Sequence, residues 1–170
     1  MQICSFPAID FSRQQGVGAP VWHGRAASGG ELHEFALAAR EVGARITAIW
    51  GADRRALGEG FRLHCVFGIE AGHAWVSLDL PAEAPCYPDL ADVFAAANRM
   101  QRATRDMVGI ANAGGDQRPW LRHGGWPADW YPLRHDAGDP PEFANRPTDY
   151  DLVKVGGEGA HEIPVGPIHA

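Results

Sequence analysis

This chain of 170 residues has few cysteines and no long hydrophobic run, and both absences limit what it can be. Its three cysteines, Cys4, Cys65 and Cys86, show no CxxC spacing, and an odd number fits a reducing compartment better than a disulfide framework. The longest apolar runs are far shorter than the roughly 20 residues that a membrane-spanning helix needs. Met1 to Asp10 lacks the basic start and the apolar stretch of a secretory signal. The sequence therefore predicts a protein that folds in water inside a cell.

Motifs that mark catalytic and cofactor sites are also missing from the sequence. Gly16 to Gly18 lacks the third glycine of a dinucleotide fingerprint, and no serine stands in a GxSxG elbow. The eight histidines form no HExxH pair, and a metal site bridged by His64 and His73 is conceivable but unsupported. The formal net charge of −6 disfavours a broad electrostatic grip on nucleic acid. We therefore expect no bound metal or cofactor, no catalytic residue and no nucleic-acid partner.

The composition is that of an ordinary globular protein, with 45% hydrophobic and 21% charged residues, which suits one domain with a core. The 13 prolines are unevenly placed, since Met1 to Pro81 holds three and Pro119 to Pro167 holds eight. Because proline interrupts helices and sheets, the last third of the chain is expected to consist mostly of loops. We divide the chain into a domain over residues 1–136, a Pro/Gly-rich linker over 137–157 and a further segment over 158–170.

Hydrophobic periodicity predicts one helix and three strands in the first half of the chain. Gly29 to Gly43 has apolar residues at helical spacing, and Ser28 suits its N-terminal cap. The apolar stripe consists of Leu32, Phe35, Ala36, Ala39 and Val42. Arg45 to Trp50 is rich in strand-forming residues, and the ranges 61–69 and 73–80 alternate apolar and polar residues, which predicts an antiparallel hairpin. Its inward residues are Phe61, Leu63, Cys65, Phe67 and Ile69 on one strand and Val76, Leu78 and Leu80 on the other.

A second helical region is expected from Asp89 to Gly109, because glycine suits the left-handed cap position and apolar residues again share a face. These residues are Leu90, Val93, Phe94, Ala97, Met100 and Met107. A break of the helix near Ala96 to Asn98 is an alternative to one continuous helix. The order of helix, strands, helix and loops predicts an α+β fold. In it, two or three helices pack on a small mixed or antiparallel sheet, and a long irregular extension follows.

The most unusual residues lie in the second half of this helix and in the loop after it. The helix reads ANRMQRATRDMVGI from Ala97 to Ile110, and the loop from Asp116 to Asp136 holds three tryptophans, a tyrosine and three prolines. Arg102 and Asp106 could form an ordinary ion pair on a solvated helix face, and the tryptophans could fill the domain's own core. Because arginine makes bidentate contacts and stacks on aromatic rings, we favour a role for Arg102 and Asp106 in holding this loop or a partner subunit. The loop itself has the composition of a docking surface, since arginine and tryptophan are enriched at protein interfaces.

This region resembles the C subunit of respiratory complex I, the NADH:quinone oxidoreductase. It resembles still more the related domain at the front of the large subunits of membrane-bound nickel–iron hydrogenases of the formate hydrogenlyase type. The sequences that carry the resemblance are ANRMQRATRDMVGI, DQRPWLRHGGWP and YPLRHD. The residues that match the signature of the complex I family are Asn98, Arg102, Asp106, Met107, Gly109 and Ile110. Gln101, Ala103 and Arg105 depart from it, which favours the hydrogenase-like branch.

The end of the chain carries a second resemblance. Residues 158–170, EGAHEIPVGPIHA, are similar to the opening of the large subunit that follows this domain in fused proteins of this kind. The resemblance implies that Gly166, Pro167 and His169 belong to a loop that approaches the quinone or active-site region. We therefore expect the parent polypeptide to continue past Ala170 into a large subunit.

The resemblance implies a cofactor-free accessory subunit or domain of a multisubunit oxidoreductase, either NADH:quinone oxidoreductase or an energy-converting hydrogenase. The implied partners are a large subunit, in cis or in trans, and iron–sulfur subunits, which would hold the iron–sulfur clusters, the NAD site or the nickel–iron centre. Contact with the inner, cytoplasmic face of the membrane would come only through the complex. The residues expected at the partner interface are Asn98, Arg99, Arg102, Arg105, Asp106, Arg118, Trp120, Arg122, His123, Trp126 and Arg134.

Two alternatives remain open. The arginine, tryptophan and histidine residues of the loop could serve an independent soluble enzyme, which a substrate-sized apolar pocket around His123 would favour. The domain could also be a stand-alone adaptor that has left the complex, which co-purification without any redox subunit would favour.

Overall fold

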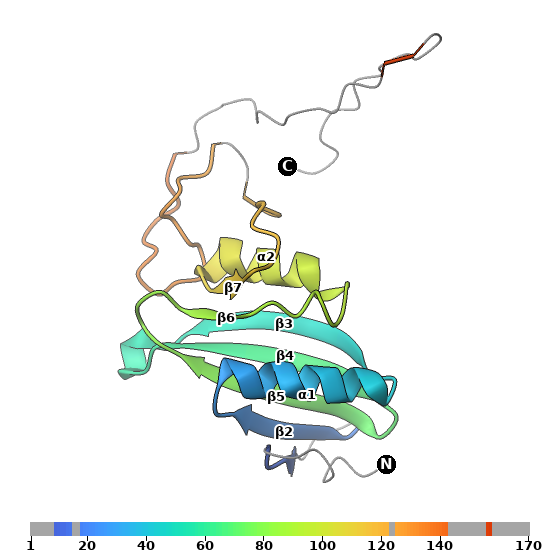
Figure 1. The fold of residues 1–170 in the computed structure, drawn as a ribbon. Coiled ribbons are helices and arrows are strands. Elements are labelled where there is room, and N and C mark those ends of the chain that lie inside the picture. The colour runs from blue at the N-terminus through green and yellow to red at the C-terminus, as the bar shows by residue number, and fades with distance from the viewer. Residues whose placement is uncertain (1–8, 15–17, 123–124, 143–155, 158–170) are drawn as a thin grey trace.

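The computed structural model describes residues 9–14, 18–122, 125–142 and 156–157. Within these residues two α-helices, one short 3₁₀ helix and seven strands form the α+β domain that the sequence predicts (Figure 1). The elements are β1 (Ser12–Gln14), β2 (Val21–Ala26), α1 (Gly29–Glu41), β3 (Arg45–Asp53), the 3₁₀ helix η2 (Arg55–Leu57), β4 (Phe61–Ile69), β5 (Gly72–Leu80), β6 (Cys86–Pro88), α2 (Ala97–Val108) and β7 (Ala111–Ala113). No helix in this part of the chain has the length and apolar character to cross a membrane.

The main sheet has five strands in the order β1-β2-β5-β4-β3. The predicted hairpin of β4 and β5 is confirmed, with Phe61 opposite Leu80. β3 pairs antiparallel with β4 and continues past the predicted end at Trp50 to Asp53. β2 runs parallel to β5, so the sheet is mixed. The sequence pattern does not indicate β1 or β2, because β1 has only three polar residues and β2 has no clean alternation.

Helix α1 forms where the periodicity predicts it. The Ser28 hydroxyl accepts a hydrogen bond from the N–H of Glu31 at 3.2 Å, which caps the helix, and four residues of the predicted stripe are buried. Val42, the fifth, is 43% exposed because the helix ends at Glu41. Gly43 follows with φ 76°, a left-handed conformation that glycine adopts without strain and that turns the chain toward β3.

The second helical region is shorter than the sequence predicts. The α-helix begins only at Ala97, and residues 90–96 form turns, so the region is split where a break was left open. The physical reason is that a side chain, rather than a backbone carbonyl of a helix, accepts a backbone hydrogen bond here. Gln101 Oε1 accepts the N–H of Leu90 at 2.8 Å, which satisfies this buried backbone group without a helix.

A second, two-stranded sheet is not indicated by the sequence pattern. β6 pairs parallel with β7, and Tyr87 lies opposite Asn112. The proline-rich segment that contains β6 predicts only a break in regular structure. Tyr87 is nevertheless 2% exposed, and this burial raises the pKa of its phenol. The small sheet ties the chain before α2 to the chain after it.

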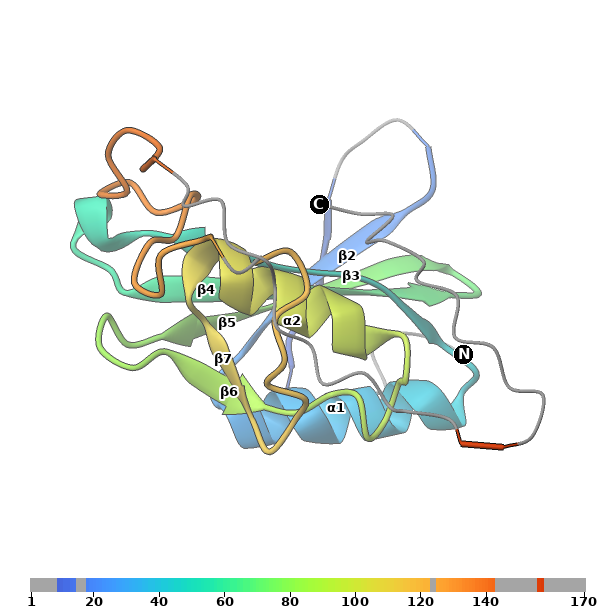
Figure 2. The same cartoon turned by 90° about the horizontal axis from the view of Figure 1, so that it is seen from above.

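Both helices cover the same face of the main sheet (Figures 1 and 2). Phe35 of α1 contacts Phe67 of β4, with ring centroids 5.2 Å apart. The hydroxyl of Thr104 in α2 donates to the carbonyl of Ile49 in β3 at 3.4 Å. The hydrophobic core therefore lies between one face of the sheet and the two helices, and α2 holds the loop on its outer side.

Candidate functional site

The candidate site is the loop of residues 116–136, and its main support is Asp106 in α2. The Asp106 side chain is 2% exposed, and its Oδ2 accepts three backbone N–H groups. The donors are Trp120 and Leu121 at 2.7 Å and Arg122 at 3.1 Å. A buried carboxylate needs such partners, and bonds between backbone donors and a charged acceptor are strong. The surface ion pair between Arg102 and Asp106 is not formed, because the loop takes the carboxylate.

Two arginines of α2 hold the first part of the loop by its carbonyl groups. Arg102 donates from Nε to the carbonyl of Arg118 at 2.8 Å and from Nη2 to that of Pro119 at 2.7 Å. Arg105 donates to both the backbone and side-chain oxygens of Gln117, at 2.5 and 2.7 Å. The planar guanidinium suits this task because it presents several donors in one fixed fork.

Neighbouring side chains of α2 and the loop complete the support of Arg102. Asn98 Oδ1 accepts a hydrogen bond from Arg102 at 3.4 Å, and an Asp116 oxygen lies 3.5 Å from the same guanidinium. Asp116 also pairs with Arg118 at 2.6 Å, and this hydrogen bond lowers the pKa of the Asp116 carboxyl. The start of the loop is therefore joined to α2 by both hydrogen bonds and opposite charges.

Trp120 lies on the outside of this arrangement. The Arg99 and Arg102 guanidinium carbons are 4.7 and 5.3 Å from the centre of its ring, within the range of cation–π contacts. Trp120 and Leu121 are each 44% exposed although their backbone N–H groups are fixed by Asp106. The loop thus holds two large apolar side chains at the surface in a defined position.

Arg122 organises the second part of the loop. It donates to the carbonyls of Pro127 and Ala128 at 2.8 and 2.7 Å and to that of Trp130 at 3.2 Å. The indole N–H of Trp126 donates to the same Trp130 carbonyl at 2.9 Å. Trp126 and Trp130 are half-buried, so these two indoles pack within the loop, whereas Trp120 lies outside it.

Arg134 joins the end of the loop to the end of α2. Its Nε donates to the carbonyl of Val108 at 2.7 Å, and its guanidinium lies 4.1 Å from the Tyr131 ring centre. Gly109 has φ 80°, and a Cβ atom there would lie 2.2 Å from Arg134 Nη2. The left-handed conformation therefore favours glycine at this position, and a side chain here would also displace the Arg134 guanidinium. Beside this contact, Leu133 remains 60% exposed.

A cluster that the sequence does not indicate fastens the loop to the sheet. Asp53, at the end of β3, accepts hydrogen bonds from Arg55 and from both the backbone and the ring of His135. Arg55 also contacts Asp136 at 2.7 Å. The hydrogen bonds from Arg55 lower the pKa of the Asp53 carboxyl. Asp53 and His135 are 82 positions apart, so no local signal relates them.

Among the described residues, Asp53, His135 and Asp136 form the one group that could hold a metal ion, with ligand atoms within 4.8 Å of one another. The Arg55 guanidinium already occupies this position, because it contacts the carboxylates of Asp53 and Asp136 at 2.7 Å each. Any metal would have to displace this guanidinium. His64 and His73, considered together in the sequence, belong to no such group in this part of the chain.

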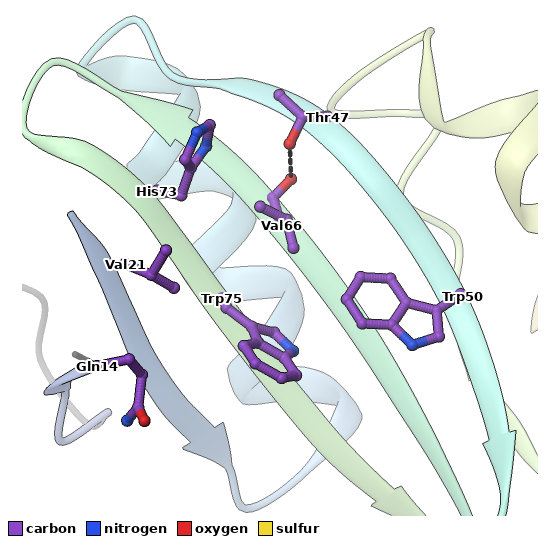
Figure 3. A pocket seen from close by; sticks show the side chains of 7 residues that line it. All are labelled: Gln14, Val21, Thr47, Trp50, Val66, His73 and Trp75. Atoms are coloured by element: carbon purple, nitrogen blue, oxygen red, sulfur yellow. Dashed lines mark hydrogen bonds between the residues drawn. The ribbon is translucent and has the colours of Figure 1, made fainter. Parts of the chain in front are cut away.

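The face of the sheet that the helices leave uncovered carries an aromatic cluster. Trp50 stacks on His64 with ring centroids 4.8 Å apart, and the indole N–H of Trp75 donates to His64 Nδ1 at 3.0 Å. A shallow cavity of about 420 Å³ lies beside the two tryptophans (Figure 3). Its lining residues are Gln14, Val21, Thr47, Trp50, Val66, His73 and Trp75. Burial lowers the pKa of His64 to about 4, so the ring is neutral near pH 7.

The structure brings most of the predicted site residues together. The residues that lie on α2 or in the loop are Asn98, Arg99, Arg102, Arg105, Asp106, Arg118, Trp120, Arg122, Trp126 and Arg134. Most of them make the internal contacts described above, so their direct task is to position the loop. His123, Gly166, Pro167 and His169 lie outside the described residues.

Residues 27–141 match the protein family described as "Respiratory-chain NADH dehydrogenase, 30 Kd subunit". The chain belongs to this family. Its members are subunits of multisubunit respiratory or hydrogenase-type complexes. The resemblance carried by α2 and the loop is thereby confirmed, and the matched range includes both.

Two proteins of Escherichia coli (strain K12) are similar to most of the chain. Formate hydrogenlyase subunit 5 is 30% identical over 138 residues, and hydrogenase-4 component G is 30% identical over 131 residues. The alignments cover 75% and 73% of this chain but 24% of each relative. The chain therefore spans about a quarter of the length of these curated relatives. Both names agree with the hydrogenase-like branch that the sequence of α2 favours.

Solved structures share the fold. A chain of the membrane-bound sulfane sulfur reductase, described as an archaeal respiratory membrane complex, has a TM-score of 0.59 at 19% identity, covering 68% of this chain and 70% of that one. A trypsin-resistant fragment of Nqo5 has a TM-score of 0.52 at 19% identity, covering 61% and 86%. At this level of identity the likeness concerns the fold alone.

Proposed function

We propose that this chain is a cofactor-free accessory subunit or domain of a multisubunit oxidoreductase, of the NADH:quinone oxidoreductase or energy-converting hydrogenase type. It braces a large subunit, in cis or in trans, and the neighbouring iron–sulfur subunits, which carry the redox centres. The complex holds it at the inner, cytoplasmic face of the membrane. Family membership supports this setting, and the names of the Escherichia coli relatives favour the hydrogenase type.

One observation supports the mode of action, namely the exposure of large apolar side chains whose backbone is held by hydrogen bonds to Asp106. Asp106 fixes the backbone of Trp120 and Leu121, yet each side chain stays 44% exposed. Exposed apolar groups cost free energy in water, and a loop fixed in advance loses little entropy when a partner binds it. This combination favours a protein-docking surface over a reaction centre.

The composition of the native complex tests the proposal directly. The chain would be tagged at its own locus and purified from its host under mild conditions, and every co-migrating polypeptide would be identified by mass spectrometry. We expect a large subunit and iron–sulfur subunits of one oxidoreductase in fixed stoichiometry. Purification without any redox subunit would overturn the proposal, as would substrate turnover by the isolated, metal-stripped chain.

Substitution of Trp120 separates docking from folding. We expect Trp120→Ala to weaken partner association by about 2 kcal/mol, roughly thirtyfold, because a central indole contributes much of an interface's free energy. The free energy of unfolding should fall by less than about 1 kcal/mol, since the side chain is half-exposed. Leu57→Ala is the matched control, because Leu57 is 67% exposed at η2, outside the loop. Equal losses of association and stability in Trp120→Ala would contradict the docking role.

A further inference from the structure

The surface around Trp120 is cationic, although the whole chain is acidic. We define the Arg–Trp patch as Arg99, Arg102, Arg118, Trp120 and Leu121. Within the patch and the side chains that support it, four arginines stand against two aspartates. The arginines are Arg99, Arg102, Arg105 and Arg118, and the aspartates are Asp106 and Asp116. The chain carries a formal net charge of −6, so a net positive surface here is a local feature rather than a general one.

The arginines of the patch differ in how exposed their guanidinium groups are and in how many contacts these groups make within the domain. Arg102 is 13% exposed and donates to two loop carbonyls, so little of it remains available. Arg118 pairs with Asp116 but is 80% exposed. Arg99 is exposed, and among the described residues it has no carboxylate within ion-pair distance; its contact is with the Trp120 ring at 4.7 Å. Arg99 and Arg118 are therefore the charges open to a partner.

We propose that the Arg–Trp patch binds an acidic segment of the neighbouring oxidoreductase subunit, in which Asp or Glu residues flank an aliphatic side chain. The inference rests on the proposed function, and charge complementarity selects the occupant. Carboxylates suit Arg99 and Arg118 because guanidinium groups bind them in a planar, bidentate way. The aliphatic side chain suits Trp120 and Leu121, which are each 44% exposed, and the Arg99 guanidinium lies 4.7 Å from the centre of the Trp120 ring.

The position of the patch also favours binding in a fixed orientation. Its indole and its leucine stand on consecutive residues whose N–H groups share one acceptor, Asp106 Oδ2, at 2.7 Å each. Arg99 and Arg102 both lie against the indole, so cationic and apolar groups meet at Trp120. A partner segment must therefore offer acid and aliphatic groups side by side, which selects among partner surfaces.

Charge reversal in the native complex tests the proposal. The Arg99→Glu, Arg118→Glu double variant leaves untouched the arginines that hold the loop, Arg102 and Arg105. We expect its affinity for the co-purifying large subunit to fall at least about tenfold, with the melting temperature little changed, because charge pairs at an interface govern recognition. The matched control is Arg40→Glu, Arg45→Glu, which reverses two exposed arginines at the end of α1 and the start of β3. Unchanged association in the first variant, or an equal loss in the control, would overturn the proposal.

A photo-crosslinking amino acid at Leu121 identifies the chemistry of the occupant. We expect it to capture a peptide of a redox subunit with Asp or Glu within a few residues of the crosslink. Capture of a basic or uncharged peptide would overturn the assignment, and so would an association that nuclease treatment abolishes. If the tagged chain purifies with redox subunits and only the charge reversal or the crosslink fails, this inference alone is wrong. If no redox subunit purifies, the proposed function falls with it.

Discussion

The two helices cover the same face of one sheet, yet they bury different kinds of side chain. Helix α1 buries four residues, all of them apolar, and its contribution is hydrophobic. Helix α2 buries Gln101, Thr104 and Asp106 beside its apolar residues. These polar groups reach segments on both sides of the helix in sequence, including Leu90 and the loop of residues 116–136. Helix α1 therefore stabilises the core of the sheet, whereas α2 also positions a surface that lies beyond the core.

The greatest loss of stability should follow from removing the acceptor at the centre of this surface. Asp106→Ala should lower the free energy of unfolding by about 4 kcal/mol, because three backbone N–H groups lose their buried charged acceptor. Urea denaturation measures the loss, and hydrogen exchange should show faster exchange at Trp120 and Leu121. Asp129→Ala, an exposed aspartate of the same loop, is the control and should change stability by less than about 0.5 kcal/mol. Unchanged hydrogen exchange at Trp120 and Leu121 in Asp106→Ala would contradict the role of α2 in positioning the loop.

A substitution in α1 tests the role assigned to the other helix. Leu32 is 1% exposed, and Leu32→Ala should cost about 3 kcal/mol through lost burial and a residual cavity. At temperatures where the variant stays folded, partner association should remain as in the wild type, because α1 does not hold the loop. Leu37→Ala on the same helix removes a side chain that is 45% exposed and should cost less than about 1 kcal/mol. An association defect in Leu32→Ala without unfolding would show that α1 also serves the docking surface.

A smaller change, which depends on pH, is expected on the face that neither helix covers. The folded pKa of His64 is about 4, below the usual 6.5, because the ring is partly buried. Between these values the unfolded chain binds more protons than the folded one, so stability falls as the pH drops from 7 to 5. Because the ring is partly exposed, we expect a loss of only about 1 kcal/mol. Thermal unfolding of the wild type and His64→Gln across this range measures it.

His64→Gln retains an acceptor for the Trp75 indole N–H but cannot titrate in this range. The variant should therefore lose stability less steeply with falling pH than the wild type. It should keep some dependence, because burial also lowers the pKa of His23. Carboxyl groups such as Asp53, whose pKa is lowered by Arg55, lose their stabilising charge only at more acid pH. Identical slopes in the two proteins would contradict the assignment to His64.

The sequence predicted the parts of the fold that follow from local patterns. Alternation identified the hairpin of β4 and β5, and helical spacing with the Ser28 cap identified α1. Periodicity was less informative in α2, where Gln101 and Thr104 occupy buried positions that an apolar pattern does not reveal. The parallel pair of β6 and β7 was missed because each strand has only three residues. A three-residue strand is too short for any alternation to be recognised.

The sequence proposed the candidate site but did not show how its residues are held. Composition and resemblance drew attention to α2 and the loop, and the family match covers both. The sequence left a surface ion pair between Arg102 and Asp106 as the simpler alternative and favoured a role in holding this loop or a partner subunit; both residues bind the loop backbone. It did not indicate that Asp53 fastens the loop, because nothing near a strand end identifies a partner 82 positions away.

The hairpin of β4 and β5, helix α1, the family and the region that carries its signature can be read from the order of residues. Which side chains of that region serve the domain, and which remain exposed, depends on the folded chain. The physical reason is that a helix or strand depends on near neighbours, whereas the partner of a buried charge depends on how the chain closes on itself. Asp106 and Trp120 both stand in the conspicuous region, but one is 2% exposed and the other 44%. That difference in exposure arises when the loop folds back on α2, and it cannot be predicted from the pattern of residues along the chain.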